Sequence, residues 1–244
     1  MKLSFQLKVG AIAILLTKIN AVFAQGAFVN LDFEDTSILQ NQSPGFVDAT
    51  EAFPGWSIYY GTNQQTFVLY NSAGIGSTTV DLIGTNGDVG LGHKSIEGGF
   101  SALLQGGISG SGPFYETAAS LRQTGLVPAT AHSLFFKAHE LDGRFSVFLG
   151  GMSIPYFAIS NGPSYTLFGA DVSAFAGQTA ELNFSLLREP GLASSDWVLD
   201  SIQFSTSVIP EPSVATLAVL GVVVVGWKLL LNCHRPRTTR KRVC

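Results

Sequence analysis

Short apolar runs rich in Val, Ile, Phe, Tyr and Thr recur through the middle of the chain and alternate with turn residues such as Asn86-Gly87-Asp88. Runs of this length, separated by Gly, Asn, Asp and Pro, are typical of β-strands. No long 3.6-residue periodicity interrupts them, and the longest helical candidate, Asp171–Ala176, ends at Gly177. The pattern therefore predicts an all-β domain, an antiparallel β-sandwich of the jelly-roll type. The expected strands are Ala27–Glu34, Trp56–Tyr60, Thr66–Tyr70, Thr78–Ile83, Phe100–Gln105, Ala119–Thr124, His132–Ala138, Arg144–Leu149, Tyr165–Phe168, Ala180–Leu187 and Trp197–Phe204.

The last of these runs has apolar residues on both faces. Alternation along an extended strand places Trp197 and Leu199 on one face and Val198, Ile202 and Phe204 on the other. We therefore expect this strand to be covered on both sides.

The first 24 residues have the order of a secretory signal peptide. Lys2 and Lys8 precede a short apolar core, Val9–Leu16, and Val22-Phe23-Ala24 supplies the small residues of a cleavage site. The core is short for a membrane span, so we expect cleavage after Ala24, with an uncleaved anchor as the alternative.

The other end of the chain has the features of a membrane anchor. Residues 214–231 include one charge, Lys228, and as a helix these 18 residues would extend about 27 Å, enough for a thin bilayer. A buried core helix is the alternative, but it would not be expected after a Pro-Glu-Pro break or with so many valines. The chain is thus expected to divide into a signal peptide (1–24), an exported β-sandwich (25–207) and a C-terminal sorting region (208–244).

Charge is distributed unevenly along the chain. Residues 25–209 carry 5 basic and 16 acidic groups, a net charge of −11, whereas the whole chain has −3. The basic residues that follow the apolar segment are expected to stay in the cytoplasm, which places the acidic body on the far side of the inner membrane. Phosphate backbones would be repelled by that body, so nucleic-acid binding is disfavoured. The basic tail comprises Arg235, Arg237, Arg240, Lys241 and Arg242.

The triplet Pro210-Glu211-Pro212, the apolar segment and the basic tail together resemble the PEP-CTERM sorting domain of exported bacterial proteins. That resemblance implies recognition by an exosortase-like processing enzyme, with the protein sent to the cell envelope or the extracellular matrix. The triplet alone is equally compatible with a stiff, extended linker, because proline keeps the backbone out of a helix.

A second resemblance lies in the expected exported domain. Asn30-Leu31-Asp32-Phe33-Glu34, Pro54-Gly55-Trp56 and Trp197-Val198-Leu199-Asp200-Ser201-Ile202 are similar to opening and closing segments of galactose-binding-like jelly rolls, which include carbohydrate-binding modules. The resemblance implies a structural Ca²⁺ held by Glu34 and Asp200. The alternative is that both carboxylates are solvated or cap turns.

No catalytic pattern stands out in the sequence. His93, His132 and His139 fit no zinc-ligand spacing and are interpreted as surface or hydrogen-bonded core histidines. The chain has enough carboxylates for a glycosidase pair, but only the distance between two of them in the folded chain would decide whether they form one.

We expect a non-enzymatic exported envelope or matrix protein. The alternatives are a carbohydrate-binding module with structural calcium and a small polysaccharide-active enzyme. The aromatic candidates for sugar stacking are Trp56, Tyr59, Tyr60, Tyr70, Tyr115, Tyr156 and Tyr165.

Overall fold

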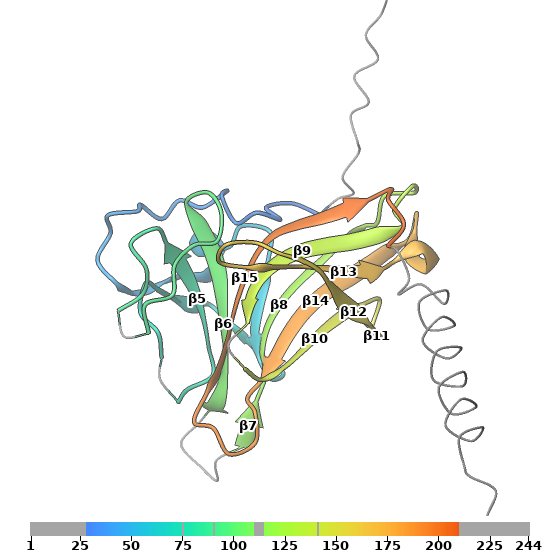
Figure 1. Cartoon of the computed structure of the whole chain (residues 1–244). Coiled ribbons are helices and arrows are strands. Elements are labelled where there is room, and N and C mark those ends of the chain that lie inside the picture. The colour runs from blue at the N-terminus through green and yellow to red at the C-terminus, as the bar shows by residue number, and fades with distance from the viewer. Residues whose placement is uncertain (1–27, 75, 90, 110–114, 141, 210–244) are drawn as a thin grey trace, which may run out of the picture.

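Two β-sheets packed face to face form the part of the chain that the computed structural model describes, residues 28–209 without 75, 90, 110–114 and 141 (Figure 1). This arrangement confirms the prediction of an all-β, two-sheet domain. The expected signal peptide, Pro-Glu-Pro triplet, apolar segment 214–231 and basic tail lie outside the described residues. Within the described residues, no helix is long and apolar enough to cross a membrane.

The larger sheet has nine strands, with β15 and β6 near its middle. Its order is β1 (Gly45–Asp48), β4 (Phe67–Tyr70), β5 (Thr79–Gly84), β6 (Phe100–Ser109), β15 (Ser195–Ser205), β9 (Ser133–Glu140), β13 (Thr166–Asp171) and β12 (Tyr156–Asn161), with β7 (Tyr115–Thr117) paired to β6. Neighbouring strands are antiparallel except β4 and β5, which pair in parallel. The expectation of a wholly antiparallel sandwich is therefore wrong at this one pair.

The smaller sheet has six strands. Its order is β11 (Met152–Ile154), β10 (Arg144–Leu149), β14 (Thr179–Leu187), β8 (Ala119–Leu126), β2 (Ser57–Tyr60) and β3 (Asn63–Gln65). Among the described residues, helix is confined to α1 (Ala49–Ala52) and the 3-10 turn η1 (Ser173–Phe175). The turn η1 lies inside the predicted helical candidate 171–176, and Gly177 follows it with φ +75°.

The space between the sheets is filled largely by aromatic rings. The indole of Trp197 stacks on Phe145 with centroids 4.1 Å apart, and Phe136 contacts the rings of Phe145, Phe168 and Phe184. These side chains are buried and come from both sheets. Large aromatic side chains dominate the energetics of such cores, so this cluster holds the two sheets together.

The alternation of side chains between the two faces of strand β15 is interrupted half-way along its length. Its pairing with β9 shifts between Asp200 and Gln203, and Ser201 has a left-handed φ of +49°. This irregularity, a β-bulge, lets Trp197 and Leu199 before it and Ile202 and Phe204 after it all face the inter-sheet core. The predicted grouping of Val198 with Ile202 and Phe204 is therefore wrong, although both faces of the strand are covered, as expected.

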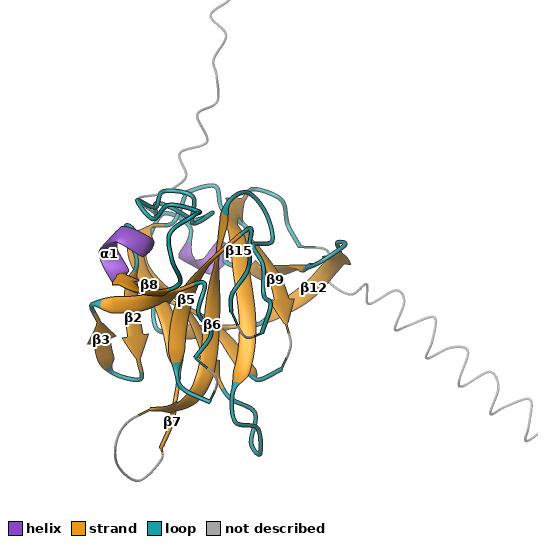
Figure 2. Ribbon diagram, turned by 90° about the vertical axis from the view of Figure 1, so that its left-hand side faces the viewer, coloured by secondary structure: helices purple, strands orange, loops and turns teal. Residues whose placement is uncertain are grey.

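The outer face of the larger sheet is also covered, by residues 85–99 between β5 and β6, here called the β5–β6 loop (Figure 2). Ile83, Leu103 and Val198 form a second, smaller apolar cluster on that face, and Ile96 of the loop packs against it. Around the cluster the same face carries five buried polar side chains, those of Asp81, Ser101, Gln105, Asp196 and Asp200. The loop thus encloses a polar layer outside the sandwich core.

Candidate ligand-binding cleft

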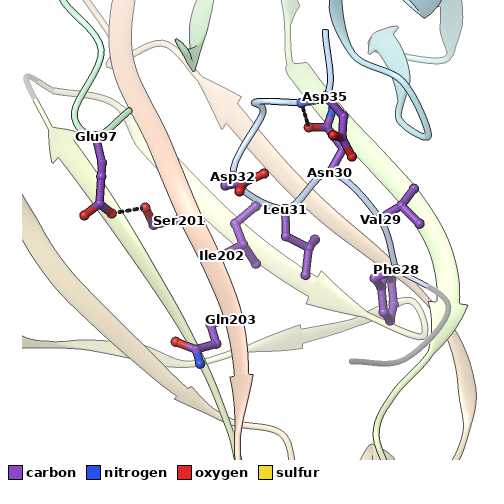
Figure 3. A pocket seen from close by; sticks show the side chains of 10 residues that line it. All are labelled: Phe28, Val29, Asn30, Leu31, Asp32, Asp35, Glu97, Ser201, Ile202 and Gln203. Carbon is purple, nitrogen blue, oxygen red and sulfur yellow. Dashed lines mark hydrogen bonds between the residues drawn. The ribbon is translucent and has the colours of Figure 1, made fainter. Parts of the chain in front are cut away.

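An open cleft of about 540 Å³ lies beside the bulge of β15, between the first described segment and Glu97 of the β5–β6 loop (Figure 3). The first segment was expected to be a strand, but it is irregular and has left-handed backbone at Asn30 and Phe33. It is joined to β15 by a hydrogen bond from the Ile202 N–H to the Leu31 carbonyl, 2.9 Å long. The lining residues are Phe28, Val29, Asn30, Leu31, Asp32, Asp35, Glu97, Ser201, Ile202 and Gln203.

Buried and part-buried hydrogen bonds fix the wall made by residues 30–35. The Trp56 indole N–H donates to the Asn30 carbonyl at 2.9 Å, and the Asn30 side-chain amide donates to the Pro54 carbonyl at 3.2 Å. The Asn30 side-chain oxygen accepts from the Asp35 N–H at 2.9 Å. Asparagine tolerates the left-handed conformation found here. This wall therefore holds its backbone in place while the carboxylates of Asp32 and Asp35 stay exposed.

Glu97 and Ser201 form the opposite wall. The Ser201 hydroxyl donates to Glu97 Oε2 at 2.7 Å, and the Lys137 ammonium pairs with the same oxygen. The hydrogen bond from Lys137, and then that from Ser201, hold the pKa of Glu97 below its usual value. Glu97 is consequently ionised at neutral pH, and it stands at the mouth of the cleft with the exposed side chain of Gln203 nearby.

Asp200, one of the two predicted calcium ligands, lies behind this wall and is 1% exposed. Its Oδ2 accepts from the Ser101 hydroxyl at 2.6 Å and the Glu97 N–H at 3.0 Å, and its Oδ1 accepts from the Ser201 N–H at 2.6 Å. Burial raises the pKa of Asp200 to about 6, opposed by these hydrogen bonds and assisted by the charge of Glu34. Asp200 therefore fastens the β5–β6 loop to the bulge.

Glu34, the other predicted calcium ligand, binds the same segment. Its Oε1 accepts from the N–H groups of Gly99 and Phe100, at 2.8 and 3.0 Å. The structure thus brings Glu34 and Asp200 to one loop, as the resemblance implied, but hydrogen-bond donors occupy three of their four carboxylate oxygens.

Calcium requires six to eight oxygen ligands. The hydrogen-bonded arrangement of Glu34 and Asp200 does not fit that requirement. Across the described residues no three His, Cys, Asp or Glu side chains are grouped so that they could hold a metal ion. Calcium binding stays a prediction from the resemblance.

The predicted sugar-stacking aromatics do not line this cleft. Trp56 and Tyr70 are buried in the core. The ring of Tyr59 lies 4.2 Å from the Arg122 guanidinium, and the ring of Tyr165 lies 5.1 Å from the Lys137 ammonium. Phe28, which does line the cleft, is buried against Phe204. The cleft therefore offers carboxylates, a hydroxyl and amides as its binding groups.

Sequence reasoning missed most of these cleft residues. Asp32 and Ser201 belong to the segments of the second resemblance, but no sequence pattern pairs Ser201 with Glu97, which lies 104 positions away and shares a hydrogen bond with it. One local signal could have found Glu97, because it immediately precedes Gly98-Gly99, and glycine pairs often mark a bend. A carboxylate beside a bend at the end of a strand is a common position for a binding residue.

Comparison with known proteins identifies a similar solved structure but no family for the chain. No protein-family model and no curated protein matches the chain. A solved structure, the enzymatically active domain of tailspike protein 4 from bacteriophage CBA120, is similar with 14% sequence identity and a TM-score of 0.39. The match covers 74% of this chain and 21% of that one, so the chain spans about a fifth of the tailspike chain.

This finding corrects the expectation of a non-enzymatic protein. The solved structure that the chain resembles is described as enzymatically active, which conflicts with that expectation, and we do not retain it. At this identity and TM-score the similarity does not assign an activity, a substrate or residues to this chain.

Proposed function

We propose that this chain is an exported protein whose β-sandwich binds polysaccharide through the cleft between Asp32 and Glu97. The observation that carries the proposal is the cleft itself, about 540 Å³ in volume and lined by exposed carboxylates, a hydroxyl and an amide. Ligand sites in proteins commonly measure about 300–1,000 Å³ and use a few fixed polar groups for orientation. A sugar ring presents several hydroxyls that match such groups.

The cleft's polar groups favour a hydroxyl-rich ligand. Ionised carboxylates accept strong hydrogen bonds from hydroxyl groups, and the Gln203 amide can both donate and accept. Glu97 is already oriented by Ser201 and Lys137, so little side-chain freedom is lost when a ligand binds. These properties support recognition of sugar hydroxyls at fixed positions.

The negative charge of the cleft narrows the class of polysaccharide that we propose it binds. Asp32, Asp35 and Glu97 all line the cleft, and residues 25–209 carry a net charge of −11. Glycans with uronate or sulfate groups would be repelled at this surface. The proposed ligands are therefore neutral polysaccharides or those containing amino sugars.

Export and anchoring complete the proposal. A signal peptide cleaved after Ala24, an apolar anchor at 214–231 and a PEP-CTERM-like signal at Pro210-Glu211-Pro212 would place the β-sandwich outside the inner membrane, attached to the envelope or released from it. The galactose-binding-like jelly roll to which the opening and closing segments are similar is compatible with such a location. The expected partners are the membrane, an exosortase-like enzyme and polysaccharide.

The binding proposal is tested with the full chain, purified in detergent, on an array of neutral, amino and acidic glycans. We expect binding to neutral or amino glycans and at least a tenfold loss of affinity in the double variant Asp32→Asn/Glu97→Gln. Glu181→Gln, an exposed carboxylate on β14 that does not line the cleft, is the matched control and should bind as the parent does. Selective binding to acidic glycans, or equal binding by both variants, would contradict the proposal.

The export proposal has its own experiment. Intact-mass measurement on envelope and medium fractions should detect a chain that begins at Gln25, and Glu211→Ala should change the proportion that keeps its C-terminal region. Recovery of Met1 in exported material, together with identical processing of the variant, would remove both sorting assignments.

A further inference from the structure

A buried carboxylate and imidazole pair lies in the β5–β6 loop, apart from the proposed binding cleft. Nδ1 of His93 lies 2.6 Å from Oδ2 of Asp88, and the side chains are 4% and 0% exposed. The other oxygen of Asp88 accepts from the N–H groups of Leu91 and Gly92, at 3.0 and 2.6 Å. These three hydrogen bonds all come from residues of the β5–β6 loop and fix the Asp88 carboxylate. The fixed carboxylate in turn orients the imidazole of His93.

A cavity of about 290 Å³ opens beside this pair. His93 lines it together with Lys94, Ser95, His139 and Ser164, so the β5–β6 loop, β9 and the hairpin between β12 and β13 all contribute to its walls. Nδ1 contacts Asp88, so Nε2 is the ring nitrogen outside that contact. Lys94 and His139 are exposed, and they bring an ammonium group and a second imidazole to the same cavity.

More buried carboxylates lie behind the pair. Asp196 is close enough for its pKa to respond to the charges of His93 and Asp88, and Asp81 responds to Asp88. Oδ1 of Asp81 is buried and has no hydrogen-bond partner in the described part of the chain. Carboxyl groups so close to the cavity favour an uncharged ligand over an anion.

We propose that His93, positioned by Asp88, is the general base of a hydrolytic site for small acyl esters, specifically the O-acyl groups that decorate neutral sugars. The choice of an acylated sugar rests on the proposed polysaccharide binding, whereas the acyl-ester chemistry rests on the His93 cavity alone. A cavity of about 290 Å³ is large enough for a short acyl group and a single sugar ring.

The step is an ester hydrolysis with no redox change. A water oxygen attacks the acyl carbon while Nε2 of His93 takes one of its protons, and the carbonyl electrons move to oxygen. The tetrahedral intermediate then collapses, the bond from carbon to the sugar oxygen breaks, and the imidazolium returns the proton to that oxygen. The products are a carboxylic acid and the free sugar hydroxyl.

The surrounding groups have separate roles. Asp88 is a positioning residue, since its carboxylate accepts a hydrogen bond from the Nδ1–H group, which favours the tautomer with a basic Nε2 and holds the ring in place. Lys94 can place its positive charge where negative charge develops on the carbonyl oxygen, and His139 can donate a hydrogen bond from the same cavity wall.

The test uses hydrolysis of p-nitrophenyl acetate by the full chain in detergent. We expect His93→Gln to lower kcat/KM by about 100-fold or more, the usual contribution of a general base. Asp88→Asn should lower kcat with little change in KM, because the substrate still fits but the tautomer is wrong. His132→Gln is the matched control, an exposed histidine that does not line the cavity, and should hydrolyse the ester as the parent does.

Loss of activity through misfolding is separated by chemical rescue. Imidazole added to His93→Ala should restore part of the lost rate if the cavity persists. The proposal fails if the parent hydrolyses the ester no faster than His93→Gln, or if imidazole restores nothing to a variant that circular dichroism shows to be folded. Because p-nitrophenyl acetate carries no sugar, its hydrolysis reports on the His93 cavity alone, whereas the glycan array reports on the cleft, so failure of glycan binding and failure of this site give different results.

Discussion

The two faces of the larger sheet are both buried, but they are buried in different ways. The inner face is covered by the smaller sheet and carries side chains such as Phe136, Leu199 and Phe204. The outer face is covered by the β5–β6 loop and carries Asp81, Asp196 and Asp200 around a small apolar cluster. Apolar burial stabilises the fold at any pH, whereas buried carboxylates cost free energy that depends on protonation. Both proposed sites border the polar, outer face.

The largest loss of stability is expected when a buried ring on the inner face is removed. Phe136→Ala removes a fully buried ring that contacts three other phenylalanines, and substitutions of this kind usually cost about 3–5 kcal/mol. Phe135→Ala changes the residue just before it on β9, which is only half-buried, and should lower the free energy of unfolding clearly less. Urea unfolding of both variants measures the difference. Equal losses would mean that the inner face is not the dominant source of stability.

The second prediction concerns the outer face and its dependence on pH. Burial raises the pKa of Asp81 from 3.8 to about 7. The folded chain therefore binds more protons than the unfolded chain between these values, so the stability from this group is full below pH 4 and is lost as pH rises to 7. At about 1.4 kcal/mol per pKa unit, the change is a few kcal/mol at most.

Asp81→Asn should flatten this dependence when the free energy of unfolding is measured from pH 4.5 to 7.5. Asp171→Asn is the control, because hydrogen bonds from Ser173 lower the pKa of that exposed carboxyl. The stability that Asp171 contributes is present above pH 4 and lost on acidification, so its pH dependence has the opposite sign to that of Asp81. A parent and an Asp81→Asn variant with parallel profiles would show that Asp81 does not titrate in this range.

A smaller effect is expected where the first segment holds the loop in place. Glu34→Gln weakens the hydrogen bonds that Oε1 accepts from Gly99 and Phe100, and bonds to a charged group contribute about 1.5–3 kcal/mol each at most. Because Glu34 is exposed, we expect a loss of roughly 1 kcal/mol. Hydrogen exchange should speed up at residues 99 and 100 while β14 stays protected. Unchanged exchange at these residues would contradict the role given to Glu34.

The smallest effect on stability is expected at the cleft. Glu97→Gln weakens an exposed ion pair with Lys137, and such pairs contribute about 0–1 kcal/mol. The variant should therefore melt within a few degrees of the parent, although its affinity for glycans falls. Thermal unfolding followed by circular dichroism checks this expectation. A large drop in melting temperature would identify Glu97 as a structural residue.

Strand-rich regions with clear alternation could be predicted from the sequence. In β14, buried residues such as Leu182, Phe184 and Leu186 alternate with exposed or half-buried ones, and the predicted strand Ala180–Leu187 falls inside it. The short edge strands were missed because they carry no such pattern. Asn63–Gln65 is wholly polar and is held as β3 only by its pairing with β2.

The interruptions of regular structure could not be predicted. Phe28, Leu31 and Phe33 are buried, as residues of a strand could be, yet left-handed backbone at Asn30 and Phe33 makes the segment irregular. The bulge at Ser201 likewise changes which residues of β15 share a face. Such features depend on contacts between distant segments, and alternation along one strand does not contain that information.

The candidate sites were even less accessible from sequence. Glu34 and Asp200, which the resemblance paired as calcium ligands, both accept hydrogen bonds from the end of the β5–β6 loop, but the cleft also needs Glu97 of that loop to meet Ser201 of β15. The pairing of Asp88 with His93 is local and could have been noticed as a carboxylate five residues before a histidine. Its importance comes from burial and from the cavity, which only the folded chain provides.

The central position of β15 has a mechanical consequence. This strand is hydrogen-bonded to β6 on one side and to β9 on the other, and both partners run antiparallel to it. A force applied at Ser205 along the strand would load these two ladders in shear, so many bonds would have to break together before β15 could slide out. A domain pulled from that point should resist extension far better than one pulled from an edge strand such as β12.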